Sequence, residues 1–322
     1  MPVSNAATQV SPSASKSGDR EIASTRIFNA PRDLVWKLFT EPEHIKQWWG
    51  PRGFSLTIHK MDVRPGGEWS FIMHGPDGRD YENEVTYTAV VRPTRIAYKH
   101  TVGPFFEAIT DFTEENGKTI ISWRMIFPSA ADRDATAEKY GAVEGLTQTI
   151  DRLEERVAYT VDAPGFQMSR TFHAPRELVW KAWIDPECLA KWWGPKEFPT
   201  TVVRMDVRRG GEMLYYMTAP GGQEFWSKWV YREIVPPAKL IYVSCFSDAQ
   251  GGLTRHPFFP NWPAYGLHTV TFTEEAGKTT LTIHSVPLGA NDIERAALAE
   301  GLPMMTAGYS SSFEKLDEFL AG

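Results

Sequence analysis

The stretch PRDLVWKLFTEPEHIKQWWGP, residues 31–51, recurs as PRELVWKAWIDPECLAKWWGP, residues 175–195, with 12 of 21 positions identical. The same spacing of 144 residues relates MDVRPGGE, which starts at Met61, to MDVRRGGE, which starts at Met205. A period of this length is that of a complete globular domain, whereas solenoid repeats have periods of roughly 20 to 50 residues. The sequence therefore predicts one domain present twice.

Composition sets the broad class of the protein. The chain has 322 residues, enough for two domains that each bury a core. A net charge of −6 gives no basic surface for a phosphate backbone, which excludes nucleic acid as a partner. The two cysteines, Cys188 and Cys245, favour packed thiols in a reducing compartment over a disulfide framework. No apolar run reaches the roughly 18 residues that a membrane span needs, and we expect a cytoplasmic protein.

The same order of elements is expected in each half. An alternating strand leads into Ala-Pro, where proline starts a short helix, and a second short helix ends at Trp-Trp-Gly-Pro. Turns rich in glycine and proline then separate about six to seven short alternating runs, which is typical of an antiparallel meander. Apolar residues at steps of three and four over residues 143–157 and 302–320 predict a long closing helix in each half.

These elements indicate an α+β protein with two tandem domains. The first domain is expected over residues 21–160, the linker over 161–165 and the second domain over 166–322. Residues 1–20 are small, polar and proline-containing, which predicts a disordered leader rather than a signal peptide.

Several motifs together carry a family resemblance. Phe28-Asn-Ala-Pro31, Trp48-Trp49-Gly50-Pro51, Asp62-Val-Arg-Pro-Gly-Gly67 and the closing helix resemble the SRPBCC, or START-like helix-grip, superfamily. They are most similar to its branch related to the C-terminal domain of the activator of heat-shock protein 90 ATPase. The resemblance covers nearly the whole chain outside the leader. It implies a curved antiparallel sheet that grips the long helix, with a cavity between them that often holds an apolar ligand.

The chain departs from the family pattern midway along one strand. Family members commonly carry glycine there, whereas this sequence has Val85 in the first half and Trp229 in the second. Both side chains fill space in the cavity, and tryptophan is the larger. We therefore expect the second cavity to be the smaller one.

A second departure is an insertion of 16 residues around residues 247–265, SDAQGGLTRHPFFPNWPAY. By analogy with the fold, this loop lies near the cavity mouth. Its aromatic rings between prolines are expected to fold onto something. Packing across its own domain, an interface between the halves and a lid over the cavity all remain open.

Alternation along the strands and helical periodicity give the residues expected to face the cavity. Apolar walls with a few hydroxyl groups are what small-molecule pockets require, and Tyr87, Tyr231 and Tyr309 could supply the hydroxyls. The candidate ligand-binding residues are Trp69, Phe71, Met73, Tyr87, Trp123, Met125, Leu146, Ile150, Tyr215, Met217, Tyr231, Ile283, Met305 and Tyr309. Plain core packing is the competing interpretation for each of them, as it is for the Trp-Trp pairs.

Other chemistry finds little support in the sequence. The eight histidines show no helical zinc-site spacing, and no pair of carboxylates is placed for acid–base work. We predict no catalytic residue, no metal and no cofactor. His268 and His284 lie on adjacent predicted strands and are the one pair that could meet.

Three functions fit these observations. The first is a non-catalytic START-like protein that binds a small hydrophobic or amphipathic molecule. The second is a chaperone-associated module that binds a protein through its surface. The third is a cyclase- or hydratase-like enzyme, which would need polar groups with shifted pKa values inside the cavity.

Overall fold

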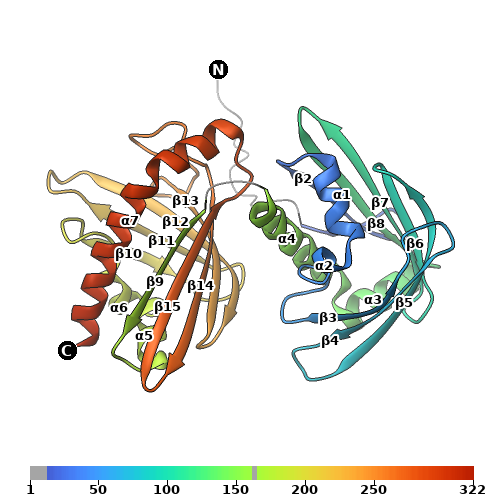
Figure 1. The fold of residues 1–322 in the computed structure, drawn as a ribbon, viewed down its shortest axis with the longest axis horizontal. Coiled ribbons are helices and arrows are strands. Elements are labelled where there is room, and N and C mark those ends of the chain that lie inside the picture. The colour runs from blue at the N-terminus through green and yellow to red at the C-terminus, as the bar shows by residue number, and fades with distance from the viewer. Residues whose placement is uncertain (1–12, 162–164) are drawn as a thin grey trace. The chain divides into compact units, whose positions relative to one another are not determined.

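The computed structural model describes residues 13–161 and 165–322. It divides into two compact units, one ending at Val161 and the other comprising the described residues from 165 onward. Each unit has an antiparallel sheet and a long closing helix, so the predicted tandem α+β architecture is confirmed (Figure 1). Residues 1–12 of the predicted leader and 162–164 of the predicted linker lie outside the described residues.

The first domain contains an eight-stranded sheet with the order β1-β2-β8-β7-β6-β5-β4-β3. Its strands are β1 (Ser15–Ser17), β2 (Glu21–Phe28), β3 (Ser55–Met61), β4 (Glu68–His74), β5 (Asp80–Val91), β6 (Arg95–His100), β7 (Phe106–Glu115) and β8 (Lys118–Ile126). Its helices are α1 (Arg32–Thr40), α2 (Pro42–Ile45), α3 (Ala130–Tyr140) and α4 (Ala142–Thr160).

The second domain repeats this plan with seven strands in the order β10-β11-β12-β13-β14-β15-β9. Its strands are β9 (Phe166–Phe172), β10 (Thr200–Met205), β11 (Glu212–Thr218), β12 (Glu224–Val235), β13 (Lys239–Phe246), β14 (Gly266–Glu275) and β15 (Lys278–Pro287). Its helices are α5 (Arg176–Ile184), α6 (Pro186–Trp192) and α7 (Asp292–Leu320).

One prediction about the start of the first domain was wrong, and one helix near its end was not predicted. The leader was expected to be disordered to residue 20, yet Ser15–Ser17 form β1, which pairs with β2 and adds an eighth strand. Short polar segments give no strand signal of their own, because the pairing depends on the open edge of β2.

Helix α3 was not predicted, since Thr136 is its one buried residue and no apolar stripe marks it.

The closing helix differs between the domains at one glycine. Gly141 lies between α3 and α4 in the left-handed region, with φ of 61°, and separates the two helices. Its counterpart 160 residues later, Gly301, lies inside the uninterrupted helix α7. The buried stripe of α4 includes Leu146, Ile150 and Leu153, which pack into the core with side chains of the sheet.

The repeated Trp-Trp-Gly-Pro segment is held by a hydrogen bond that its own sequence demands. Residue 42 is proline and has no N–H, so the Leu38 carbonyl near the end of α1 lacks its usual i→i+4 donor. The buried Trp48 indole N–H donates to that carbonyl at 2.9 Å. In the second domain, where residue 186 is proline, Trp192 donates to Ala182 at the same distance.

A cation from the long helix binds the carbonyl groups that follow each tryptophan pair. Arg152 of α4 donates to the carbonyl oxygens of Gly50 and Pro51, both at 2.9 Å. In the second domain Lys315 of α7 donates to the Gly194 carbonyl at 3.1 Å. The two cations stand on different turns of their helices, so the same contact is made from non-equivalent positions.

We predict that Trp48→Phe lowers the unfolding free energy of the first domain by about 3 kcal/mol. It leaves the buried Leu38 carbonyl without a donor and leaves a small cavity. Urea unfolding of the full chain measures the effect. The control is Trp226→Phe, because Trp226 is half-buried and its indole N–H donates to the exposed carboxylate of Glu224, not to a buried carbonyl. Equal costs for the two substitutions would contradict this account.

Candidate functional site

The first domain holds a cavity of about 800 Å³ between its sheet and α4. This volume falls within the range typical of sites for drug-sized molecules. Rings form much of its wall: Trp49 follows α2, Phe71 lies on β4, and Tyr98 and Trp123 lie on β6 and β8. Leu146 of α4 closes the opposite side. The cavity wall is thus mostly apolar, and the cavity is large enough for a ligand of many carbon atoms.

A polar pair marks one end of this cavity. The Nδ1 atom of His100 lies 2.9 Å from the Pro104 carbonyl oxygen, and Nε2 lies 3.0 Å from the side-chain oxygen of Asn83. Both oxygens only accept, so the single N–H of a neutral ring donates to one of them, and the ring stacks on Phe106. Burial lowers the pKa of His100, which keeps the ring neutral at neutral pH. This end can therefore hydrogen-bond a polar group of a ligand whose body contacts the aromatic walls.

The second domain has a much smaller cavity, of about 160 Å³, between its sheet and α7. Trp229, at the position of Val85, lines it and stacks on Tyr242 with ring centroids 4.1 Å apart. Trp193 packs edge-on against Trp229 at 4.9 Å. The prediction that the second cavity is the smaller one is confirmed.

The inserted loop forms part of the wall of this second cavity. Its residues Trp262 to Tyr265 line the cavity together with Leu298 and Met305 of α7. Trp262 packs directly over Gly301, where a Cβ atom would lie 2.3 Å from the indole ring. Among the placements that the sequence left open, packing across its own domain is therefore observed. The same loop exposes Phe258 and Phe259.

Polar side chains line the second cavity where apolar ones were expected. His268 of β14 lies between two hydroxyls: Nε2 is 2.7 Å from Ser244 Oγ and Nδ1 is 2.7 Å from Ser285 Oγ. Burial lowers the pKa of His268 to about 3, so its ring is neutral. Burial also raises the pKa of the nearby Cys245 thiol to about 11, which keeps it protonated. His268 and Cys245 are therefore uncharged, and they interact with their surroundings through hydrogen bonds and not through ionic contacts.

The suggested meeting of His268 and His284 was wrong. Ser285 is the residue opposite His268 in the ladder between β14 and β15, while His284 is opposite Thr269. Neighbouring residues of a strand point to opposite faces, so the two histidines lie on different sides of the sheet.

The predicted ligand-binding residues divide between cavity walls and filled core. Those that line the cavities are Phe71, Met73, Trp123, Met125 and Leu146 in the first domain, and Tyr215, Met305 and Tyr309 in the second. Those outside both linings are Trp69, Tyr87, Ile150, Met217, Tyr231 and Ile283. Strand alternation gives the inward face but cannot separate these two groups. Trp69, for example, is covered by the Trp49 ring at 4.8 Å.

Sequence reasoning missed the residues that give each cavity its polar character. Asn83 and His100 in the first domain, and Ser244 and His268 in the second, were not among the candidates. One signal was available: the run RIAYKH places Tyr98 and His100 on one face of β6. Ser244 lies near His268 because of the register between β13 and β14, and the sequence of neither strand by itself predicts that register.

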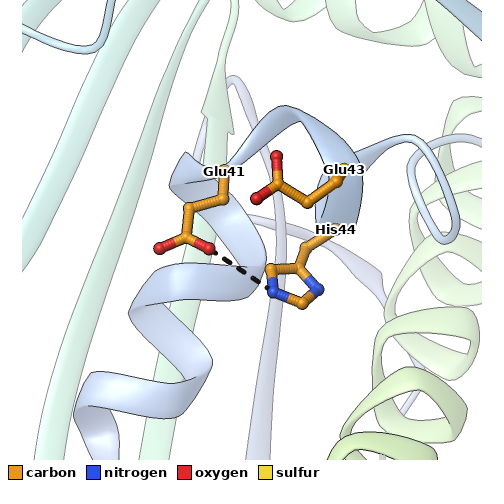
Figure 2. Close-up of side chains that lie close together, drawn as sticks. All are labelled: Glu41, Glu43 and His44. Carbon is orange, nitrogen blue, oxygen red and sulfur yellow. Dashed lines mark ion pairs between the residues drawn. The ribbon is translucent and has the colours of Figure 1, made fainter.

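Glu41, Glu43 and His44 form a cluster at the start of α2 (Figure 2), with possible ligand atoms within 4.8 Å of one another. His44 Nε2 lies 3.4 Å from a Glu41 carboxylate oxygen. The guanidinium of Arg156, which only donates, lies 3.2 Å from His44 Nδ1. Both ring nitrogens are therefore engaged, and the nearby positive charge disfavours a second cation. We assign no metal to this cluster.

The sequence and the fold were compared with those of known proteins. The profile of the family described as "Activator of Hsp90 ATPase homolog 1-like protein" matches residues 29–158 and 173–321. No match was found among curated proteins. No helix in the described ranges is both long and apolar enough to cross a bilayer.

Solved structures with similar folds include one- and two-domain proteins. Protein Ms6760 from Mycobacterium smegmatis is 26% identical over 50% of this chain and 92% of its own, with a TM-score of 0.42. A protein from Arthrobacter aurescens is 28% identical over 50% of this chain and 88% of its own, with a TM-score of 0.43. The di-domain ARO/CYC BexL from the BE-7585A biosynthetic pathway is 14% identical, covering 94% of this chain and 99% of its own, with a TM-score of 0.44.

We predict that Gly301→Ala destabilises the second domain by about 1 to 2 kcal/mol. Alanine favours a helix by roughly 1 kcal/mol, but its Cβ would collide with the Trp262 ring and displace the loop. Thermal unfolding measures the change. The control is Gly308→Ala in the same helix, where a Cβ meets nothing within 4 Å and stabilisation of up to about 1 kcal/mol is expected. Stabilisation by both alanines would refute the packing role of Gly301.

The stability of the second domain should decrease in mild acid. The pKa of His268 is about 3 in the folded protein, whereas an exposed histidine has a pKa of 6.5, so below about pH 6.5 only the unfolded state binds a proton. Stability is therefore lost as pH falls through this window, by about 2 kcal/mol between pH 7 and pH 5. Urea unfolding at both pH values, with and without His268→Leu, measures this term. The same decline in both proteins would contradict it.

Proposed function

Since the chain belongs to the activator of Hsp90 ATPase homolog 1-like family, we propose that its first domain binds a small apolar or amphipathic molecule in the cavity between sheet and long helix. The observation that carries this proposal is an 800 Å³ cavity with aromatic walls and a single polar end. Burying apolar ligand surface at about 25 cal/mol per Å² supplies useful affinity without a catalytic group.

The arrangement of the walls supports an amphipathic ligand in particular. Trp49, Tyr98 and Trp123 offer ring faces to an apolar body, while Asn83 and His100 can hydrogen-bond a head group. Asp80, Glu82 and Lys139 stand among the lining residues and extend the polar side. Because Asp80 and Glu82 are acidic, a neutral or zwitterionic head group suits this end better than an anion.

Location and two alternative functions complete the proposal. A cytoplasmic location agrees with Cys188 and Cys245, which are free thiols.

Protein binding is the second candidate function. The observation that favours it is the exposure of two aromatic side chains in the inserted loop, 63% for Phe258 and 44% for Phe259. An enzyme of the cyclase or hydratase kind would have to use the polar groups of the second cavity.

Val85→Trp tests the proposed site by giving the first cavity the residue that narrows the second. We expect it to abolish binding of an uncharged fluorescent probe, N-phenyl-1-naphthylamine, because the indole occupies the space of the ligand. Fluorescence titration of the full chain measures probe affinity. The matched control Val85→Ala removes volume at the same position and should retain binding.

Circular dichroism and thermal unfolding establish that both Val85 variants are folded. Loss of probe binding in the folded Val85→Trp variant alone supports the first cavity as the site. Failure of the wild-type chain to bind any such probe would overturn the proposal and favour the protein-binding candidate.

A further inference from the structure

The second domain has replaced an apolar pair by a polar one at matched positions of its sheet. In the first domain Ala108 of β7 faces Met125 of β8 in the ladder. In the second domain, 160 residues later, His268 faces Ser285. The preceding strand keeps a tyrosine in register with both pairs, because Tyr98 is opposite Ala108 and Tyr242 is opposite His268. The strand register is therefore the same in both domains, while an apolar pair in the first domain is replaced by a polar pair in the second.

Such a change needs an explanation, because burying polar groups costs free energy unless they are hydrogen-bonded. His268 is 7% exposed and Ser285 is 4% exposed. Each His268 nitrogen lies 2.7 Å from a serine hydroxyl, so the ring is satisfied. If packing were the only requirement, an apolar pair such as Ala108 and Met125 of the first domain would be sufficient. The polar cluster instead borders the second cavity.

The cluster leaves hydrogen-bonding capacity for a ligand. A neutral imidazole has one donor and one acceptor, so one of Ser244 and Ser285 accepts from the ring and the other donates to it. The serine that accepts keeps its own O–H to donate, and the serine that donates keeps lone pairs to accept. Tyr309 of α7 and Tyr242 bring two more hydroxyls, and burial raises the pKa of both.

Size and charge narrow the class of ligand. A cavity of about 160 Å³ is comparable to the roughly 150 Å³ cavity that holds one benzene molecule in an engineered protein. Aromatic side chains line much of the cavity, among them Trp193, Trp229 and Trp262, and such walls suit a flat ring. Of the described residues that line the cavity, none is Asp, Glu, Lys or Arg, and His268 is neutral. The site therefore favours an uncharged molecule.

We propose that the second-domain cavity is a separate binding site for a small neutral molecule with a single ring and one hydroxyl or carbonyl group, of the phenol class. The ring lies among Trp193, Trp229 and the inserted loop, and its polar group bonds the Ser244–His268–Ser285 cluster. Ser244, Cys245 and Tyr265 are half-buried and mark the side that a ligand can reach. This proposal does not depend on the ligand of the first domain.

The test is fluorine NMR of the full chain with 4-fluorophenol, and with fluorobenzene as the matched probe that lacks the hydroxyl. We expect 4-fluorophenol to bind with a dissociation constant of about 1 mM or lower, and fluorobenzene to bind at least about fivefold more weakly. Ser244→Ala should weaken 4-fluorophenol binding by about five- to tenfold. The double variant His268→Ala/Ser285→Met, which restores the pair of the first domain, should abolish the preference between the two probes.

Val85→Trp separates this proposal from the function proposed for the first domain, because it alters only the first cavity and should leave 4-fluorophenol binding unchanged. Near-UV circular dichroism checks that each variant is folded, and Ser244→Ala provides a result even if the double variant does not fold. The proposal is overturned if 4-fluorophenol does not bind up to its solubility limit. It is equally overturned if both probes bind alike, if Ser244→Ala changes nothing, or if Val85→Trp removes the binding.

Discussion

The bond between a buried tryptophan and a helix-end carbonyl holds the architecture of both domains together. Proline after the first short helix removes one backbone donor, and the indole of Trp48 or Trp192 replaces it. That bond places the next residue, Trp49 or Trp193, against its cavity. A cation from the long helix binds the carbonyls that follow. The spacing of tryptophan and proline therefore sets where the sheet, the short helices and the long helix meet.

On this shared frame a few substitutions give the domains different cavities. Val85 lines the large first cavity, whereas the bulkier Trp229 lines the small second one. His268 and Ser285 add hydrogen-bonding groups where the first domain has Ala108 and Met125. The inserted loop closes one wall of the second cavity by packing Trp262 on Gly301. The two domains thus share a structural core but differ in their cavities, since the first is large with mostly aromatic walls and the second is small with a hydrogen-bonding cluster in its wall.

Much of the fold could be predicted from the sequence because its determinants are local. The internal repeat gave the two domains, the turns gave the meander, and helical periodicity gave the buried face of α4. The strand β1 escaped prediction because it depends on a distant partner, and α3 because it has almost no buried face. Local sequence carries no signal for β1, whereas the Ser129 N-cap and the Gly141 C-cap do mark the ends of α3.

The cavity walls were harder to predict than the fold. Alternation placed Phe71 and Trp123 correctly at the cavity, but it also selected Trp69 and Ile150, which lie in filled core. The small cluster around His268 depends on the register of three strands, which no single segment specifies. The comparison of Val85 with Trp229 was more informative, because an internal repeat lets one residue's volume be judged against another's in the same frame.

The most direct measurement of the central claim is native mass spectrometry of the chain purified gently from its own host. The account predicts a co-purifying small molecule of low polarity that is lost on denaturation, because an open aromatic cavity of about 800 Å³ suits such a ligand. A clean unliganded mass, unchanged by added amphipathic compounds, would contradict it.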